Sequence, residues 1–431
     1  MRTKLIIALT LMAGSLVALA QTNPPATTYQ LGSDAKPAST DVPGQQYPKI
    51  DSERHAEFRL RAPDADRVQL DIGGHQYDMT KDDRGMWSVV TPPLVVGFHY
   101  YSFIVDGYSV ADPASEAFFG VSKMMSGIEV PSPGEDFYDA RNVPHGEVRE
   151  HWYYSQTNNA WRRCFVYTPP GYNHNPTEHY PVVYLLPGAG EDERGWSTQG
   201  HVNFILDNLI AEGKARPMIV VMENGGGSAL FNSPGFGFGR GRGPGMLMGG
   251  TNAPPQAGGT NQFRRGRFGR GGFPGFSGPA AVFPDTLLHE VIPMIDSTYR
   301  TIPDREHRAL AGLSMGGMET RMIGLAHPDA FANLGIFSGG SISTNDITDL
   351  AAFKQDIKLV FISFGSVELD SRNRSGFGGR GPFGGDPRAA TDGLKAAGIN
   401  AHFYVSPGTA HEWQTWRRSF YHFAPLLFQN P

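Results

Sequence analysis

A serine set between glycines is the residue of this sequence with the clearest potential for chemistry. Ser314 stands in a Gly-x-Ser-x-Gly pentapeptide, residues 312–316, which follows a short apolar run. In such a nucleophile elbow the serine occupies a tight turn between a strand and a helix, where its hydroxyl can reach a substrate carbonyl. Because glycine fills 54 of 431 positions, the pentapeptide alone is weak evidence. The strand-like residues 307–311 before it and the helix-like residues 318–325 after it favour the elbow.

A serine hydroxyl becomes a useful nucleophile when a base removes its proton, and histidine suits this task because its pKa lies near neutrality. His411 lies in the segment 406–413, directly after the strand-like residues 401–405. A loop after a late strand is where such a base is expected, so His411 is the candidate base. Four histidines that lack this placement are interpreted as structural: His201, His289, His327 and His402.

An imidazole base needs a carboxylate that fixes its tautomer and stabilises its positive charge. The acid is expected between the serine and the histidine in the sequence, after a strand. Glu368 and Asp370 both follow the strand-like residues 359–364. Glu368 is preferred because it is nearer to the end of the strand, and Asp370 remains the alternative.

Attack on an ester creates an oxyanion, which backbone N–H groups can stabilise. The residue after the nucleophile, Met315, is expected to supply one donor. The glycine-containing segment 186–192 follows the strand-like residues 182–186 and is expected to supply the other, from Ala189 or Gly190. These glycines therefore have a predicted role beyond forming a turn.

The elements that must position these residues alternate between strand-like and helix-like segments from about residue 137 onward. This alternation predicts a mostly parallel sheet with helices on both faces, which is an α/β fold. The expected strands are 163–167, 182–186, 218–222, 309–312, 334–337, 359–364 and 402–405. A helix is expected over 286–299, where apolar residues recur on one face.

The first twenty residues have the features of a cleaved secretory signal. Arg2 and Lys4 precede an apolar run over 5–17, and small residues follow up to Ala20. We expect cleavage near Ala20 and a secreted protein, periplasmic or extracellular. The following segment 21–50 is rich in Pro, Ala, Thr and Gln and is expected to be a flexible leader.

The rest of the chain divides by pattern into two expected domains. Short alternating apolar runs separated by turn residues predict a small all-β, immunoglobulin-like sandwich over 51–135, and the α/β domain then occupies 136–431. Glycine-rich insertions at 225–279 and 373–385 interrupt the α/β pattern and are expected to be mobile loops. The longer one is expected to act as a flap near the substrate.

Composition excludes several other classes of protein. A formal charge of −5 favours neither a nucleic-acid partner nor a membrane surface, and no later apolar run predicts a membrane anchor. Cys164 is the single cysteine, so an intrachain disulfide is impossible and a buried, inert thiol is expected. The sequence shows no cluster of His, Asp or Cys with ligand spacing, so we expect neither a metal nor a cofactor. The oligomeric state stays open.

The expected sandwich resembles the immunoglobulin-like modules classed with carbohydrate-binding family 48. The resemblance rests on residues 58–65, on 100–107 and on Asp112-Pro113. It implies either that the module binds glycan or that it packs beside the active site and shapes one of its walls.

The α/β part resembles the α/β-hydrolases of carbohydrate esterase family 1, which include feruloyl and acetylxylan esterases. The resemblance is carried by residues 188–196, 283–293 and 299–301, by the elbow, and by Pro407-Gly408 with His411-Glu412-Trp413. It implies a secreted serine esterase that removes feruloyl or acetyl groups from a plant polysaccharide such as xylan. The alternatives are a siderophore esterase and a non-catalytic glycan-binding protein. The chain departs from the family at Glu368, where members commonly have aspartate, and in its glycine-rich insertions.

Overall fold

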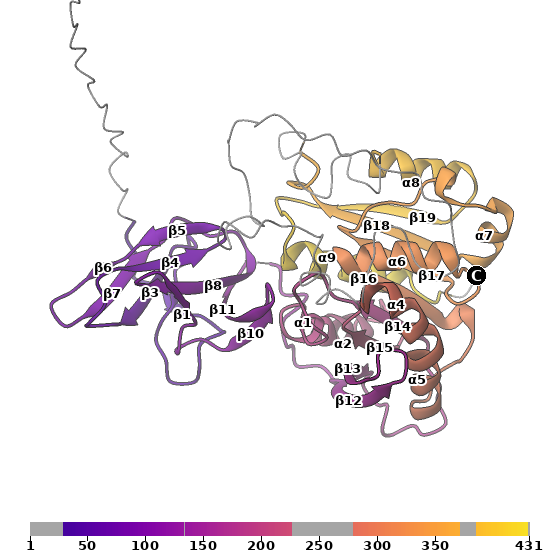
Figure 1. Cartoon of the computed structure of the whole chain (residues 1–431), viewed down its shortest axis with the longest axis horizontal. Helices are drawn as coiled ribbons and strands as arrows, with labels where there is room; N and C mark the ends of the chain where they lie inside the picture. Colours follow the sequence, from indigo (N-terminus) through magenta and orange to yellow (C-terminus); the bar gives the residue numbers. More distant parts are fainter. Residues whose placement is uncertain (1–28, 133, 226–278, 371–384, 430–431) are drawn as a thin grey trace, which may run out of the picture.

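The computed structural model describes residues 29–132, 134–225, 279–370 and 385–429. Strands of an all-β part lie on the left of Figure 1, and a larger α/β part lies on the right. The expected signal peptide, residues 226–278 of the first insertion and 373–384 of the second lie outside the described residues.

The all-β part consists of two antiparallel sheets around one apolar core. One sheet has the order β1-β2-β3-β7-β6, and the other has the order β10-β11-β8-β4-β5 with β9 paired to β8. Phe58, Tyr101 and Phe103 are completely buried between them. The bounds of the strands are β1 Lys36–Pro37, β2 Lys49–Ile50, β3 Ala56–Arg61, β4 Val68–Ile72, β5 His75–Asp78, β6 Thr80–Lys81, β7 Met86–Val90, β8 Gly97–Val105, β9 Tyr108–Val110, β10 Ala117–Gly120 and β11 Lys123–Val130. This arrangement is the β-sandwich that the sequence predicted.

The expectation of a flexible leader over 21–50 is wrong for its described part. Residues 36–37 and 49–50 pair as β1 and β2, and β2 continues the sheet at β3. Ala38 and Ile50 are buried in the core of the sandwich, and the Asp51 carboxylate accepts a hydrogen bond from the Gly32 N–H at 2.9 Å. Composition missed this because a few apolar contacts and strand pairing are enough to order a proline-rich segment on an existing sheet.

The α/β part is built on a sheet whose described strands have the order β12-β13-β15-β14-β16-β17-β18-β19. From β15 to β19 neighbouring strands are parallel, whereas β12 and β13 form an antiparallel hairpin at one edge. The bounds are β12 Glu147–Ser155, β13 Ala160–Thr168, β14 Val182–Leu186, β15 Ile219–Glu223, β16 Arg308–Leu313, β17 Asn333–Phe337, β18 Leu359–Gly365 and β19 Ala401–Ser406. The seven expected strands are confirmed, and β12 was missed.

Helices cover both faces of this sheet, as the alternating pattern predicted. Buried side chains of α1 (Gly195–Thr198), α2 (Val202–Ala211) and α9 (Trp413–Phe423) share one apolar core. Those of α4 (Pro279–Thr286), the π-helical turn Leu287–Val291, α5 (Ile292–Thr298), α6 (Met315–Ala326), α7 (Leu350–Asp356) and α8 (Pro387–Ala396) belong to the core on the other face. The expected helix over 286–299 begins earlier, at Pro279, and ends at Thr298. In the described residues, no helix is both long and apolar enough to cross a bilayer.

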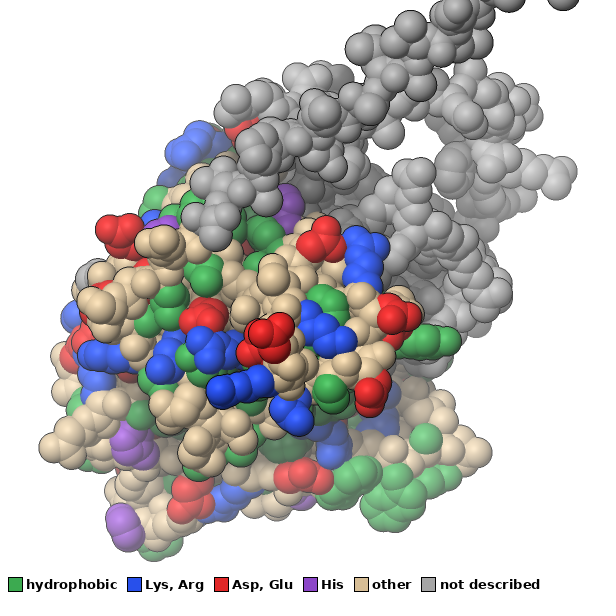
Figure 2. All heavy atoms as spheres, turned by 90° about the vertical axis from the view of Figure 1, so that its left-hand side faces the viewer, with side chains coloured by type: hydrophobic (Ala, Val, Ile, Leu, Met, Phe, Trp, Pro, Cys, Tyr) green, Lys and Arg blue, Asp and Glu red, His purple; other side chains and the backbone are tan. Residues whose placement is uncertain are grey.

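The sandwich is joined to the α/β part by ion pairs, one of which is buried. Arg417 of α9 is completely buried and donates two hydrogen bonds to Glu129 of β11, at 2.8 and 2.9 Å. Its neighbour Arg418 binds Glu135 just beyond the sandwich. The face at the sandwich end of the molecule mixes basic and acidic side chains over its described part (Figure 2), in keeping with the nearly balanced charge of the chain.

Candidate active site

The elbow predicted at Ser314 is present, and glycine is sterically required on both sides of the serine. Ser314 has φ 52° and ψ −112°, between the end of β16 and the start of α6. A Cβ added to Gly312 would lie 2.4 Å from the backbone of Gly316, and one added to Gly316 would lie 2.5 Å from the Pro187 carbonyl oxygen. The turn is therefore possible only with the observed glycines, and it holds a non-glycine residue in a backbone conformation that is normally unfavourable.

The three residues predicted to act together form a continuous chain of hydrogen bonds. The Ser314 Oγ lies 2.8 Å from Nε2 of His411, and Nδ1 of His411 lies 2.6 Å from Oε1 of Glu368. A carboxylate can only accept, so Nδ1 carries the proton and Nε2 offers its lone pair to the serine hydroxyl. This is the tautomer that a general base requires.

Glu368 is held by further hydrogen bonds on the side away from the histidine. Its Oε2 accepts from the Gly365 N–H at 2.6 Å and from the Ser338 hydroxyl at 2.9 Å. Of the two predicted acids, Glu368 is therefore the one that the structure places on the imidazole. Ser338 was missed by sequence reasoning, although its position directly after β17 was a usable signal.

Aromatic packing fixes the orientation of the imidazole. The ring of Trp416 meets the ring of His411 edge to face, with centroids 5.2 Å apart at 90°. The Trp416 indole N–H also donates to the Ser338 hydroxyl at 3.2 Å. Glu368 is buried, with 6% of its side chain exposed, whereas 25% of the His411 side chain is exposed. The base is thus open to substrate while the acid is shielded from water.

The loop predicted to help bind an oxyanion, residues 187–192, lies beside the elbow. The Gly316 N–H donates to the Pro187 carbonyl at 3.1 Å, and a Cβ added to Gly188 would lie 3.3 Å from the Ser314 Cβ. Met315 is the first residue of α6, where a helix leaves N–H groups without an intrahelical acceptor. Donation to substrate by Met315, Ala189 and Gly190 stays a prediction, which this placement favours.

The other residues singled out in the sequence lie apart from this hydrogen-bonded chain. Cys164 is buried in the core, as expected, and burial raises the pKa of its thiol far above the usual range. Burial, with a contribution from Arg417, lowers the pKa of His201 to about 4, so this ring is neutral at physiological pH. Among the described residues, no group of three or more His, Cys, Asp or Glu side chains could hold a metal ion.

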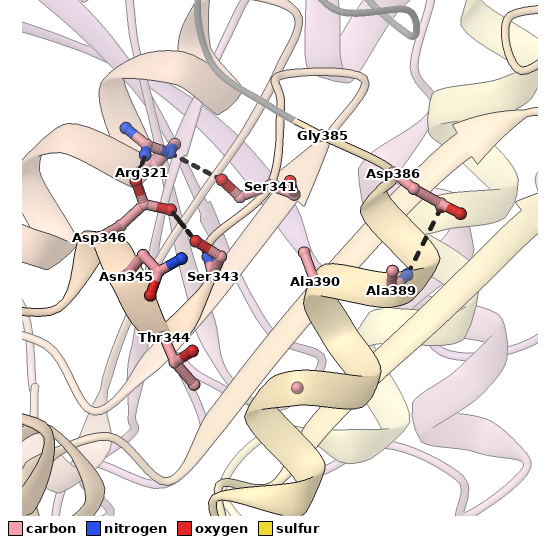
Figure 3. A pocket seen from close by; sticks show the side chains of 11 residues that line it. Arg321, Ser341, Ser343, Thr344, Asn345, Asp346, Gly385, Asp386, Ala389 and Ala390 are labelled. Carbon is pink, nitrogen blue, oxygen red and sulfur yellow. Dashed lines mark hydrogen bonds and ion pairs between the residues drawn. The ribbon is translucent and has the colours of Figure 1, made fainter.

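A polar hollow of about 500 Å³ lies between the segment after β17 and the start of α8 (Figure 3). Its charged side chains are already engaged. Arg321 pairs with Asp346 at 2.7 Å and donates to the Ser341 carbonyl, and Asp386 accepts from backbone N–H groups at the start of α8. The hollow therefore gives no indication of an ionic ligand.

The family of the chain follows from comparison with known proteins. Residues 155–242 and 275–366 match the family model described as "putative esterase". An enterobactin esterase from Shigella flexneri has a similar fold, with a TM-score of 0.55 at 16% identity, over 86% of this chain and 92% of its own. The family-model match identifies the α/β part of the chain as a member of this esterase family, and the likeness to the enterobactin esterase shows an α/β-hydrolase fold. Within that class it is homologous to feruloyl esterases.

Two curated relatives carry xylan-related names. An endo-1,4-beta-xylanase/feruloyl esterase from Xylanibacter ruminicola is 36% identical over 404 residues, which are 92% of this chain and 48% of that protein. Endo-1,4-beta-xylanase Y from Acetivibrio thermocellus is 24% identical over 361 residues, 76% of this chain and 27% of that protein. The chain thus spans about half or less of the length of these relatives. No comparison identifies the family of the N-terminal sandwich, so its resemblance to family 48 stays a prediction.

Proposed function

We propose that this enzyme is a serine esterase that removes feruloyl or acetyl groups from a plant cell-wall polysaccharide such as xylan. The observation that carries the proposal is the hydrogen-bonded chain from Ser314 through His411 to Glu368 at the end of a parallel sheet. The substrate class is supported by the relative named as a xylanase and feruloyl esterase, which aligns with nearly the whole chain.

In this mechanism Ser314 Oγ attacks the ester carbonyl while its proton passes to Nε2 of His411. Glu368 stabilises the imidazolium, and backbone N–H groups of Met315 and of the loop 187–192 receive the oxyanion. The imidazolium then protonates the departing sugar oxygen, and an acyl ester of Ser314 remains. Water, deprotonated by His411, cleaves this ester and releases the carboxylic acid.

The test compares the wild type with Ser314→Ala on methyl ferulate, acetylated xylan, nitrophenyl acetate and a cyclic catecholate triester. We expect Ser314→Ala to lose ester turnover by about 10⁴-fold or more while it keeps the thermal unfolding midpoint of the wild type. Turnover of the catecholate triester above that of ferulate would favour a siderophore esterase instead. Unchanged turnover in Ser314→Ala would refute catalysis by this serine, and absence of turnover in the wild type as well would favour a non-catalytic glycan-binding protein.

We also propose that the protein is exported, because its first twenty residues have the pattern of a cleaved signal. The expected result is a mature protein that begins near Gln21 in the periplasm or medium, as read by N-terminal sequencing. An intact Met1 on the protein isolated from its native cells would contradict export by cleavage of this segment.

A further inference from the structure

The N-terminal sandwich reaches the loop that lies beside the catalytic serine. The turn between β10 and β11 contains Val121 and Ser122, and the Ser122 N–H donates to the Gly190 carbonyl at 2.8 Å. The approach is close: a Cβ added to Gly190 would lie 3.2 Å from the Ser122 nitrogen and 3.3 Å from the Val121 Cα. Two parts of the chain that are far apart in sequence are therefore in backbone contact next to the active site.

The turn has positive φ at both of its central residues, as the two-residue hairpin between Gly120 and Lys123 requires. Val121 has φ 52° and Ser122 has φ 63°, values that residues other than glycine rarely adopt and that a β-branched residue avoids most. The hairpin turn thereby presents the Ser122 N–H to the Gly190 carbonyl.

A second contact comes from Tyr100 on β8. Its hydroxyl donates to Oε2 of Glu191, the residue after Gly190, at 2.8 Å. The alternative acceptor, the Phe119 carbonyl, is farther away at 3.4 Å. The same hydroxyl accepts hydrogen bonds from the Gln199 amide at 2.5 Å and from the Trp413 indole at 3.3 Å.

Tyr100 thereby connects two catalytic segments. A phenol has one proton to donate and two lone pairs to accept with, and all three are used here. Glu191 belongs to the loop next to Ser314, whereas Trp413 lies two residues after His411. A single side chain of the sandwich thus links the loop for the oxyanion with the segment that carries the base.

We propose that the sandwich is a working part of the catalytic centre: Tyr100 and the β10–β11 turn hold the loop 187–192 in the conformation that receives the oxyanion. The inference rests on the proposed ester hydrolysis at Ser314 and adds a residue to it. Tyr100 is a positioning residue, because it acts on the reaction through Glu191 and Gly190.

The surroundings of Glu191 support this assignment. Burial raises the pKa of its carboxyl to about 8, with a further contribution from Asp192, so the group is neutral at pH 7. Tyr100 faces it from β8, and Asp192 on its own loop is paired with Arg194. Gln199, which follows α1, lies 3.4 Å away, and Trp413 of α9 reaches it through the Tyr100 hydroxyl. Loss of the proton would place a buried negative charge on the loop that must stabilise an oxyanion.

The matched pair Tyr100→Phe and Tyr101→Phe tests the proposal in the full-length protein. Each change removes one hydroxyl from a tyrosine of β8, half-buried at Tyr100 and fully buried at Tyr101, but the Tyr101 hydroxyl binds Asp112 inside the sandwich at 2.8 Å. We expect Tyr100→Phe to lower kcat on methyl ferulate by about tenfold with KM within about twofold, a fraction of the loss of a whole oxyanion donor. A trifluoromethyl ketone analogue, which mimics the oxyanion, should bind more weakly by the same factor. Tyr101→Phe should change neither quantity.

Equal losses of kcat in both variants, or an unchanged kcat in Tyr100→Phe, would overturn the proposal. Ser314→Ala separates this failure from failure of the proposed function. If Ser314→Ala is inactive and Tyr100→Phe is fully active, ester hydrolysis stands and only the role of the sandwich falls. If Ser314→Ala stays active, the proposed function itself falls.

Glu191→Gln gives a second, independent readout because it keeps an oxygen acceptor for Tyr100 and cannot ionise. We expect its kcat, relative to its own value at pH 7, to lack the fall that the wild type shows above about pH 8. Identical pH profiles for the two proteins would overturn the role assigned to Glu191.

Discussion

Replacing Glu368 with glutamine should disable His411 as a base, although the two side chains have the same shape and the same number of heavy atoms. The carboxylate binds His411 through one oxygen, while the other accepts from the Gly365 N–H at 2.6 Å and from Ser338. The backbone N–H of Gly365 can only donate, so it selects the oxygen of a glutamine amide. The amide NH₂ must then face Nδ1 of His411.

An NH₂ group at Nδ1 forces that nitrogen to accept, which moves the ring proton to Nε2. The imidazole then presents a donor to Ser314 and cannot remove its proton. The opposite amide orientation would set two donors against each other at 2.6 Å in a buried place, at a cost of about 1–3 kcal/mol. Loss of the correct tautomer should lower kcat by about 10³–10⁴-fold, which corresponds to a barrier higher by about 4.1–5.4 kcal/mol.

The assay is steady-state hydrolysis of methyl ferulate by Glu368→Gln, with Asp370→Asn as the matched control. We expect KM to change little in Glu368→Gln and kcat in Asp370→Asn to stay within about threefold of the wild type. A loss of less than tenfold in Glu368→Gln, or a larger loss in Asp370→Asn, would refute the assignment of the acid.

Three further predictions concern stability and the elbow. Glu129→Gln leaves the buried Arg417 without its counter-charge and should lower the free energy of unfolding by about 3 kcal/mol, measured by urea denaturation. A change below about 1 kcal/mol would contradict a tight interface between the sandwich and the α/β part. Gly316→Ala places a Cβ 2.5 Å from the Pro187 oxygen, so the elbow must shift. Activity should then fall at least about 100-fold even in protein that folds. Normal activity would show that the turn tolerates a side chain. The folded protein keeps the Glu191 proton up to about pH 8 and the unfolded chain releases it near 4.5, so the contribution of Glu191 to stability should fall as the pH rises between these values. The free energy of unfolding of the wild type should therefore fall by about 3–4 kcal/mol more than that of Glu191→Gln between pH 5 and pH 8, as chemical denaturation of both proteins would show.

Residues at the ends of strands were the part of the site that the sequence predicted best. Ser314, Glu368 and His411 each follow a parallel strand, and the carboxyl ends of parallel strands meet at one edge of a sheet. Their order along the chain then assigns the roles. The structure accordingly brings together three residues that are up to 97 positions apart.

The sequence patterns could not predict the contacts between the two domains. Tyr100 reads as an ordinary residue of an alternating strand, and Glu191 as an exposed acid in a glycine turn. Their hydrogen bond spans 91 residues and depends on how the sandwich docks, which no local periodicity encodes. Of the edge hairpin, the sequence predicted β13 but not β12. The strand β12 is polar along much of its length and is stabilised as a strand by pairing with β13, which its own sequence does not reveal.

The fully buried Arg417 limits how the two domains of this protein could have been combined in evolution. An enzyme whose binding module is joined only by a linker can exchange that module for another, since neither half depends on the other. Here α9, which begins two residues after His411, buries a guanidinium whose carboxylate partner Glu129 belongs to the sandwich. Exchange of the sandwich for an unrelated module would leave the Arg417 guanidinium buried without a counter-charge. The two halves should therefore melt in one calorimetric transition and pass through evolution as a single inherited unit.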